Sequence, residues 1–284
     1  LSLVALAMAL ATYPITRRLT RRLEALQQGV QAWGQGNLAV RVPEQGSDEV
    51  AFLARQFNQT ASQIEALVQS HKSLLANASH ELRTPLTRIR MGLELMGDQP
   101  SQTMREQIAQ SISEVDQLIE EILLASRLDS PEADLGSVET VDLTGLATEE
   151  SVRVGADLRL LASPDELLVA GYPRLLRRLL RNLLDNARHY GPPHSELVIE
   201  LERVSPETLV MRVNDRGPGI PTPHLEQVFA PFFRLPGSAE GGVGLGLALV
   251  RSIVKRHDGR VWCENRPGGG ASFVVELPVQ EGQA

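Results

Sequence analysis

Apolar residues recur every three or four positions through the first part of the chain, a spacing typical of amphipathic helices. One series covers residues 15–33 and ends at two glycines, and a second covers residues 50–67. Between them, apolar and polar residues alternate over residues 38–42, as in an extended connector. Two short amphipathic helices cannot bury their apolar faces alone, so the pattern predicts a parallel dimer that forms a four-helix bundle. A plain coiled-coil spacer is the alternative.

A third apolar series, over residues 75–96, contains the octet Ser79-His80-Glu81-Leu82-Arg83-Thr84-Pro85-Leu86. Pro85 removes one backbone hydrogen bond, yet the apolar phase resumes beyond it, which predicts a helix that bends there and continues. His80 lies beside the apolar seam, so we expect an exposed imidazole. The carboxylate of Glu81 can hold the proton of one ring nitrogen, and such a pair suits a nucleophile. Taken alone, the pair also fits a surface histidine beside a solvated charge.

A second long helix is expected after the turn at residues 97–101, with an apolar face from Ile108 to Ile122 and its end at Asp129. Two antiparallel helices with one apolar face each form half of a four-helix bundle. The pattern therefore predicts a helical hairpin that forms a homodimer.

The first thirteen residues, Leu1 to Tyr13, carry no charge and precede a cluster of arginines at positions 17, 18, 21 and 22. About 20 apolar residues are needed to cross a bilayer, so this run alone also fits a core helix or a signal peptide. The basic flank favours the cytoplasmic end of a truncated transmembrane helix. We therefore expect a membrane protein whose residues after about 14 are cytoplasmic.

Length and composition narrow the possible functions. The 284 residues are enough for two or three domains. A formal charge of -7 without a basic stripe argues against a nucleic-acid-binding protein. The single cysteine, Cys263, excludes an internal disulfide and a site built from several cysteines.

The C-terminal half alternates between strand and helix patterns, which predicts an α/β sandwich with one sheet backed by helices. Strands are expected at residues 167–169, 197–201, 208–213, 259–263 and 271–277. Helices are expected at residues 142–152, 173–190 and 244–257.

Several polar motifs fall on this sandwich. Asn182 and Asn186 lie one turn apart on a helix, where a neutral amide oxygen can reach a magnesium ion that bridges phosphates. The carboxylate of Asp215 can accept a hydrogen bond from an exocyclic amine, and Gly217 and Gly219 allow the backbone to approach a flat ring. By themselves, the asparagines also fit ordinary polar surface and the second segment fits a turn.

Two further motifs follow. The aromatic segment 229–234 is unusual in a chain with few aromatic residues, although it also fits a core cluster. The glycine-rich segment 241–247 opens a helix, and amides at a helix N-terminus bind anions. This segment lacks the Lys-Ser/Thr pair of a P-loop, and a glycine-rich loop alone is weak support.

Together these motifs resemble the sensor histidine kinases of bacterial two-component systems. The octet resembles their phosphoacceptor box, and the later motifs resemble the N, G1, F and G2 boxes of the GHKL ATP-binding fold. The resemblance divides the chain into a truncated transmembrane end (1–13), a HAMP relay (14–68), a dimerisation and phosphotransfer hairpin (69–130), a linker (131–139) and a catalytic ATP-binding domain (140–280).

The resemblance implies roles for individual residues. His80 would be the phosphoacceptor, Glu81 its base, and Thr84 the residue that aligns water for dephosphorylation of the partner. Asn186 would hold Mg²⁺. ATP would contact Asn182, Asn186, His189, Tyr190, Asp215, Gly217, Gly219, Phe232, Arg234, Gly242, Gly244, Leu245, Gly246 and Leu247. His189 departs from the pattern, since this position is commonly more basic, and residues 235–241 would form a short lid.

The implied activity is ATP-dependent autophosphorylation of His80, followed by transfer to an aspartate of a response-regulator receiver domain, with a phosphatase activity toward that partner. The expected location is the bacterial inner membrane. Two alternatives remain open at this point: a GHKL module that uses ATP to change conformation, and a dimeric scaffold that acts only as a phosphatase.

Overall fold

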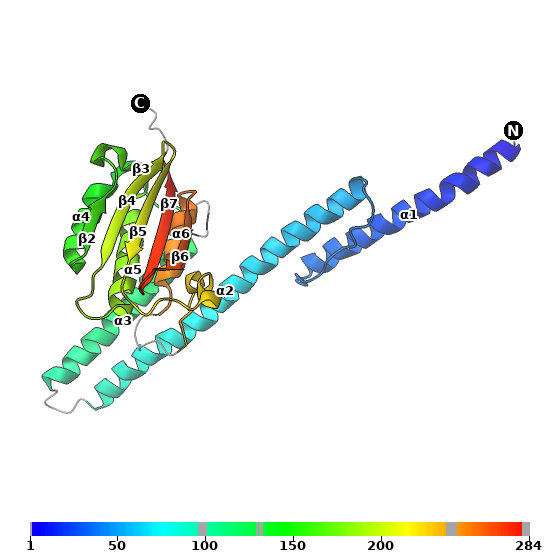
Figure 1. Ribbon diagram of the computed structural model, residues 1–284. Coiled ribbons are helices and arrows are strands. Elements are labelled where there is room, and N and C mark those ends of the chain that lie inside the picture. The colour runs from blue at the N-terminus through cyan, green and yellow to red at the C-terminus, as the bar shows by residue number, and fades with distance from the viewer. Residues whose placement is uncertain (1, 96–100, 129, 131–132, 237–242, 280–284) are drawn as a thin grey trace. The chain divides into compact units, whose positions relative to one another are not determined.

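The computed structural model describes the chain except for residues 1, 96–100, 129, 131–132, 237–242 and 280–284. It divides into two compact units, residues 1–76 and 77–284, which are described separately below. Helix α2 (Glu49–Glu94) contributes residues to both units (Figure 1).

The first unit pairs α1 (Ser2–Gly34) with the first part of α2. Asp48 caps α2, because its Oδ1 accepts a hydrogen bond of 3.0 Å from the Ala51 amide. The predicted end of the first helix at the glycines and the start of the second helix are confirmed. The connector, predicted to be extended over residues 38–42, instead begins with a turn, in which the Val40 amide donates a hydrogen bond of 3.3 Å to the Asn37 carbonyl, and it has no regular secondary structure over residues 40–45.

The connector is fixed along α2 by one asparagine. The Asn58 side chain accepts a hydrogen bond from the Val42 amide and donates one to the Val42 carbonyl, both at 2.9 Å. Val42 is buried against Gly29, where an added Cβ would lie 2.2 Å from a Val42 methyl. Glycine at position 29 is therefore needed for α1 and the connector to approach each other. In the same unit, Trp33 on α1 and Phe57 on α2 pack edge to face with ring centroids 6.3 Å apart.

The N-terminal run belongs to a longer helix. Residues 2–13 form no separate element, because α1 continues through Pro14 without a break. Within the described residues, no helix is both long enough and apolar enough to span a membrane.

In the second unit, the end of α2 and helix α3 (Gln102–Leu128) form the predicted hairpin. Helix α2 continues past Pro85, as predicted. The two helices approach closely where Gly92 faces Ile108, since an added Cβ would lie 2.8 Å from that side chain. Arg88 and Glu114 form an ion pair of 3.1 Å across the hairpin. The predicted turn at residues 97–101 falls mostly outside the described residues.

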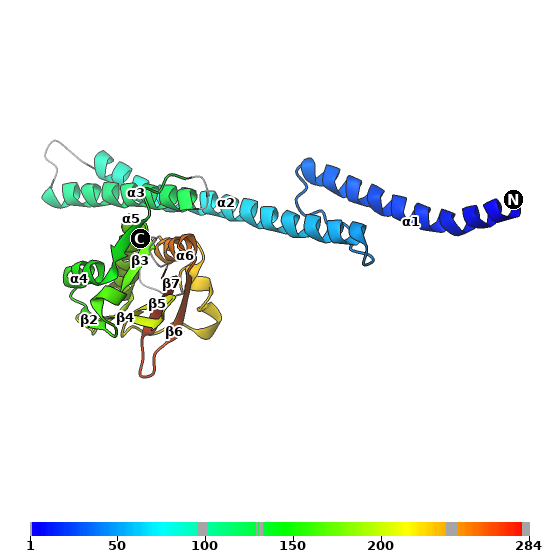
Figure 2. The ribbon, with the colours of Figure 1, turned by 90° about the horizontal axis from the view of Figure 1, so that it is seen from above.

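The α/β domain is built on a five-stranded sheet in the order β2-β4-β5-β7-β6, with a separate ladder of β1 and β3. Strands β2 and β4 are parallel, and the other neighbours are antiparallel. Figure 2 shows the helices of this domain on one side of the sheet. The strands are Glu139–Asp142 (β1), Asp157–Leu160 (β2), Leu168–Gly171 (β3), Val198–Ser205 (β4), Thr208–Asn214 (β5), Arg260–Asn265 (β6) and Ala271–Pro278 (β7). The helices are Leu143–Val154 (α4), Pro173–Tyr190 (α5) and Gly246–Arg256 (α6), with short 3₁₀ turns at Pro164–Glu166, Thr222–His224 and Gln227–Phe229.

The sandwich is confirmed, and two strands were missed by the sequence analysis. Strand β1 carries two acidic residues in a sequence of four, so its composition looks like that of a linker. Strand β2 is an edge strand with mostly exposed side chains, and the alternation in its sequence Asp-Leu-Arg-Leu covers only four residues, which is too short to distinguish it from a loop.

A buried histidine joins α6 to the β3–α5 connection. His257 is 8% exposed, and its Nε2 accepts a hydrogen bond of 3.1 Å from the Tyr172 amide. Its Nδ1 lies 2.8 Å from the Ile253 carbonyl, which requires the proton to be on Nδ1. Both contacts are satisfied by the neutral ring, and burial lowers the pKa of His257 from its ordinary value of 6.5.

We expect this histidine to make folding pH-dependent. As the pH falls below about 6.5, the unfolded chain takes up a proton that the folded ring refuses, so the free energy of unfolding decreases until the folded-state pKa is reached. The slope attributable to one such proton is at most about 1.4 kcal/mol per pH unit. Urea unfolding of the wild type and His257→Gln between pH 5 and pH 8 measures it. Equal pH slopes in the two proteins would contradict the assignment.

Candidate active site

His80 is displayed on an open face of α2. Its side chain is exposed, as is that of Thr84 one turn later, whereas Glu81 is half-buried and Pro85 is buried. The hydroxyl of Thr87 donates a hydrogen bond of 2.8 Å to the Arg83 carbonyl in the turn that contains the proline. The imidazole of His80 is therefore exposed, as predicted, and Thr84 lies on the same side of the helix.

Helix α5 is strongly amphipathic. Its buried face is formed by Leu175, Leu176, Leu179, Leu180, Leu183, Leu184 and Ala187. Asn182 and Asn186 are both half-buried, one turn apart beside this face. The amide nitrogen of Asn182 donates a hydrogen bond of 3.2 Å to the Gly246 carbonyl at the start of α6. This contact joins the asparagine helix to the glycine-rich segment.

The far end of α5 meets the turn that follows β5. An added Cβ at Gly217 would lie 3.0 Å from the Tyr190 carbonyl, so glycine allows this approach. Tyr190 is half-buried, and its ring packs edge to face with that of the exposed His189 at 4.7 Å. Helix α5 therefore contacts the segments of both Asp215 and Gly246.

Asp215 holds its own turn together. Its Oδ1 accepts hydrogen bonds from the amides of Gly217, at 2.7 Å, and of Ala271, at 3.0 Å. The residue is 6% exposed, and the described residues donate hydrogen bonds only to Oδ1. The second carboxylate oxygen is thus available to a donor from outside the chain.

The aromatic segment is locked against the glycine-rich segment. The Phe232 amide donates a hydrogen bond of 2.9 Å to the Gly244 carbonyl. An added Cβ at Gly244 would lie 2.9 Å from the Phe232 backbone, and Gly244 has a φ of +76°. Phe232 itself has a φ of +60°, a conformation that is strained for an aromatic residue. These two segments flank residues 237–242, so Gly242 and most of the predicted lid lie outside the described residues.

The remaining predicted contacts lie at the start of α6. Leu245 is buried, and Gly246 and Leu247 are half-buried. No side chain of the described residues caps the N-terminus of α6, where Leu245 is the N-cap residue. The first amides of α6 are therefore open to an anion. Gly219 lies in the Asp215 turn, and Arg234 is exposed at the end of the aromatic segment.

Three residues that support the Asp215 turn were missed by the sequence analysis. Arg266 donates a hydrogen bond of 2.8 Å to the Asp215 carbonyl, and Asn265 pairs with the amide and carbonyl of Ile220, both at 2.7 Å. An added Cβ at Gly270 would lie 2.1 Å from the Asp215 carbonyl. The sequence signal was the Pro-Gly-Gly-Gly turn at residues 267–270, between two strand patterns. This turn joins β6 and β7 into a hairpin that lies against Asp215.

The α/β domain also contacts the helical hairpin through a charge pair. Arg178 on α5 forms an ion pair of 3.0 Å with Glu121 on α3, whose side chain is 7% exposed. Glu150 lies on α4, where burial would raise its pKa, but hydrogen bonds from Arg181 on α5 and Arg153 on α4 outweigh this effect and the pKa is lowered. Arg178 therefore joins α5 to α3, and Arg181 joins α5 to α4.

This set of groups suits a nucleotide. Neutral amide oxygens, one buried carboxylate and an uncapped helix N-terminus are the groups expected around phosphates, a divalent cation and a base that carries an amine. Contacts between described residues bring them together: Asn182 with Gly246, Tyr190 with Gly217, and Phe232 with Gly244.

Comparison with known protein families also indicates a nucleotide-binding protein. Three family models match in order: the HAMP domain over residues 15–66, the His Kinase A (phospho-acceptor) domain over 70–131, and the histidine kinase-, DNA gyrase B- and HSP90-like ATPase over 171–281. The chain belongs to the sensor histidine kinases. The ATPase family match implies that this histidine kinase uses ATP.

Two curated relatives come from Escherichia coli K12. The sensor protein RstB is 35% identical over 98% of this chain and 65% of its own length, and the histidine kinase BaeS is 33% identical over 98% of this chain and 62% of its own length. The chain therefore spans somewhat less than two thirds of each. Among solved structures, the histidine kinase ThkA in complex with the response regulator TrrA has a TM-score of 0.61 at 23% identity, covering 81% of this chain and 67% of that one. Acinetobacter baumannii AdeS has a TM-score of 0.59 at 23% identity, covering 71% of this chain and 98% of that one. These two structures show the shared fold.

Asp215 provides a test of the nucleotide site. We expect Asp215→Asn to weaken ATP binding by about tenfold to a hundredfold, because a hydrogen bond to a charged group contributes about 1.5–3 kcal/mol. The fold should survive, since the amide oxygen can still accept the bonds from Gly217 and Ala271. Calorimetric titration with ATP measures the affinity, and Asp185→Asn on α5 is the matched control. Unchanged affinity in Asp215→Asn would contradict the assignment.

Proposed function

We propose that this histidine kinase transfers the γ-phosphoryl group of ATP to His80. A ring nitrogen of His80 attacks the γ-phosphorus, the bond from that phosphorus to the β–γ bridging oxygen breaks, and ADP leaves. Glu81 takes the proton from the other ring nitrogen. The observation that carries the proposal is the exposed imidazole on a helical hairpin, in the same chain as the clustered nucleotide-binding motifs.

The site residues have the following proposed roles. Asp215 accepts a hydrogen bond from the exocyclic amine of the base, beside Gly217 and Gly219. Asn182, His189, Tyr190 and the segments of Phe232 and Gly244–Leu247 surround the remainder of the nucleotide, together with Arg234 and Gly242. Asn186 supplies an amide oxygen to Mg²⁺, which would neutralise charge on the phosphates when bound.

The partner that receives the phosphoryl group is proposed to be the receiver domain of a response regulator. Its aspartate oxygen would attack phosphohistidine and release the imidazole. Thr84 lies one turn after His80 on the same exposed face, where its hydroxyl can align a water molecule for dephosphorylation of that partner. The solved complex of ThkA with TrrA supports this type of partner.

A homodimer and a membrane location complete the proposal. Large apolar side chains on α2 and α3 remain exposed in the single chain, including Leu86, Leu93, Ile112, Ile119 and Leu123. A second copy would cover them in a four-helix bundle. The uncharged run 1–13, followed by four arginines, supports a position at a bacterial inner membrane, with the chain after about residue 14 in the cytoplasm.

Autophosphorylation can be tested directly with γ-labelled ATP. We expect the wild type to acquire an acid-labile label and His80→Gln to acquire none, because the attacking nitrogen is lost. His71→Gln is the matched control, since His71 is also exposed on α2. A label that persists in His80→Gln would exclude His80 as the acceptor, and a wild type that binds ATP without becoming labelled would favour a conformational or scaffold role.

Thr84 can be tested separately from the kinase reaction. We expect Thr84→Ala to autophosphorylate at a rate within about twofold of wild type, because its hydroxyl takes no part in the attack, and to dephosphorylate the receiver at least about tenfold more slowly. Thr87→Ala is the control, because the Thr87 hydroxyl is already bound to the Arg83 carbonyl. Equal dephosphorylation by Thr84→Ala and wild type would remove the role.

A further inference from the structure

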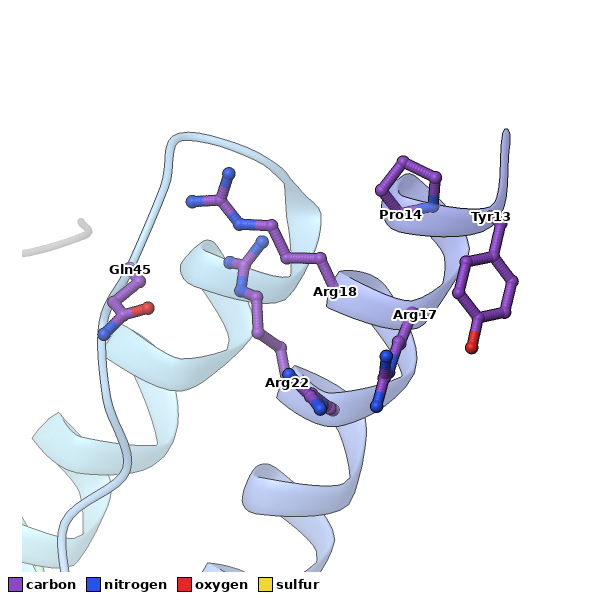
Figure 3. A pocket seen from close by; sticks show the side chains of 7 residues that line it. Tyr13, Pro14, Arg17, Arg18, Arg22 and Gln45 are labelled. Atoms are coloured by element: carbon purple, nitrogen blue, oxygen red, sulfur yellow. The ribbon is translucent and has the colours of Figure 1, made fainter. Parts of the chain in front are cut away.

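Figure 3 shows a hollow in the first unit. It has a volume of about 430 Å³ and lies between α1 and the connector. Its lining consists of Tyr13, Pro14, Arg17, Arg18, Arg21, Arg22 and Gln45. Four of these seven residues are arginines and none is acidic.

One of the four arginines is already engaged. Arg22 pairs with Asp48 through both carboxylate oxygens, the longer contact being 2.7 Å, and this ion pair holds the pKa of Asp48 well below its usual range. The Nε of Arg22 is buried and has no hydrogen-bond partner among the described residues. Asp48 thus fixes the position of Arg22 in the lining of the hollow.

The other three arginines are not neutralised by any carboxylate of the part of the chain that the structure describes. Among the described residues, no acidic side chain lies within ion-pair distance of Arg17, Arg18 or Arg21. Arg17 lies 5.8 Å from the centre of the Tyr13 ring, and Figure 3 shows Arg18 and Arg22 extending from α1 toward the connector that carries Gln45. Guanidinium groups gathered in this way, with an amide opposite them, form a site for an anion with several oxygens.

We propose that this hollow binds the phosphate of an anionic phospholipid headgroup. The choice of a lipid rests on the proposed membrane location, because the uncharged run 2–13 leads directly into the hollow along the same helix. Tyr13 and Pro14 form its apolar rim on the side of that run. Phosphate oxygens would contact Arg18 and Arg21, and Gln45 would donate from the connector. A headgroup held there would bridge α1 and the connector beside the Arg22–Asp48 pair that caps α2.

The test is binding of the full chain to vesicles of phosphatidylcholine alone or with phosphatidylglycerol. We expect phosphatidylglycerol to strengthen binding, and Arg18→Gln/Arg21→Gln to reduce this strengthening by about tenfold to thirtyfold, since each basic residue near an anionic surface contributes about 1 kcal/mol. Arg55→Gln/Lys72→Gln removes two exposed charges outside the hollow and should retain most of the effect. Arg18→Lys/Arg21→Lys should lose part of it, because lysine lacks the planar fork of donors.

Several results would overturn the proposal. If both glutamine variants lost equal affinity, or the lysine variant bound like the wild type, the binding would be a general effect of charge. If free inorganic phosphate at millimolar concentration bound the arginines and displaced the vesicles, the ligand would be phosphate and not a lipid. Autophosphorylation of the glutamine variant in detergent separates the two proposals, because it should match the wild type whether or not lipid binds.

Discussion

The leucine face of α5 is the constraint on which the nucleotide site depends. Seven apolar side chains of this helix are buried, and each large one stabilises the fold by about 1.5–3 kcal/mol on burial. The helix therefore has a single rotation in which the leucines are covered. That rotation fixes the asparagine side chains on the flank of the helix, brings Asn182 to Gly246 and places the C-terminal end of the helix against Gly217.

Close backbone contacts then align the other segments of the site. The clearest is the contact of Gly244 with Phe232, where a side chain on the glycine would overlap the neighbouring backbone and where the phenylalanine adopts an unfavourable conformation. Strain of this kind persists only where the surroundings enforce it. The two ends of the segment between them are thereby held together, close to the open N-terminus of α6. Asp215 also aligns two segments of the site, since its hydrogen bond from the Ala271 amide joins the end of β5 to the start of β7.

The helical hairpin of α2 and α3 differs from the α/β domain, because part of its apolar surface stays exposed to solvent in the single chain. In the α/β domain the sheet and helices cover each other, whereas α2 and α3 retain a row of exposed apolar side chains along the hairpin. His80 lies on the same long helix but outside that row. A dimer can therefore bury the apolar surface and leave the imidazole accessible, which agrees with the proposed transfer of phosphate to and from this residue. In the first unit, three of the four arginines that line the hollow between α1 and the connector are likewise exposed.

The sequence by itself determined the long helices, the five strands with clear apolar patterns and the identity of the motif residues, because these depend on local periodicity and residue type. The exposure of His80 followed from its place beside a helical seam. Tertiary structure alone decided that edge strand β2 joins the sheet, that Arg266, Asn265 and Gly270 support Asp215, and that the arginines after Tyr13 surround a hollow with Gln45. Each of these depends on contacts between residues distant in sequence, which no local pattern encodes. Only the folded chain could also show that residues 2–13 and the basic segment after them form the single helix α1, because a helix without a break between an apolar and a basic segment has no sequence signal at the junction.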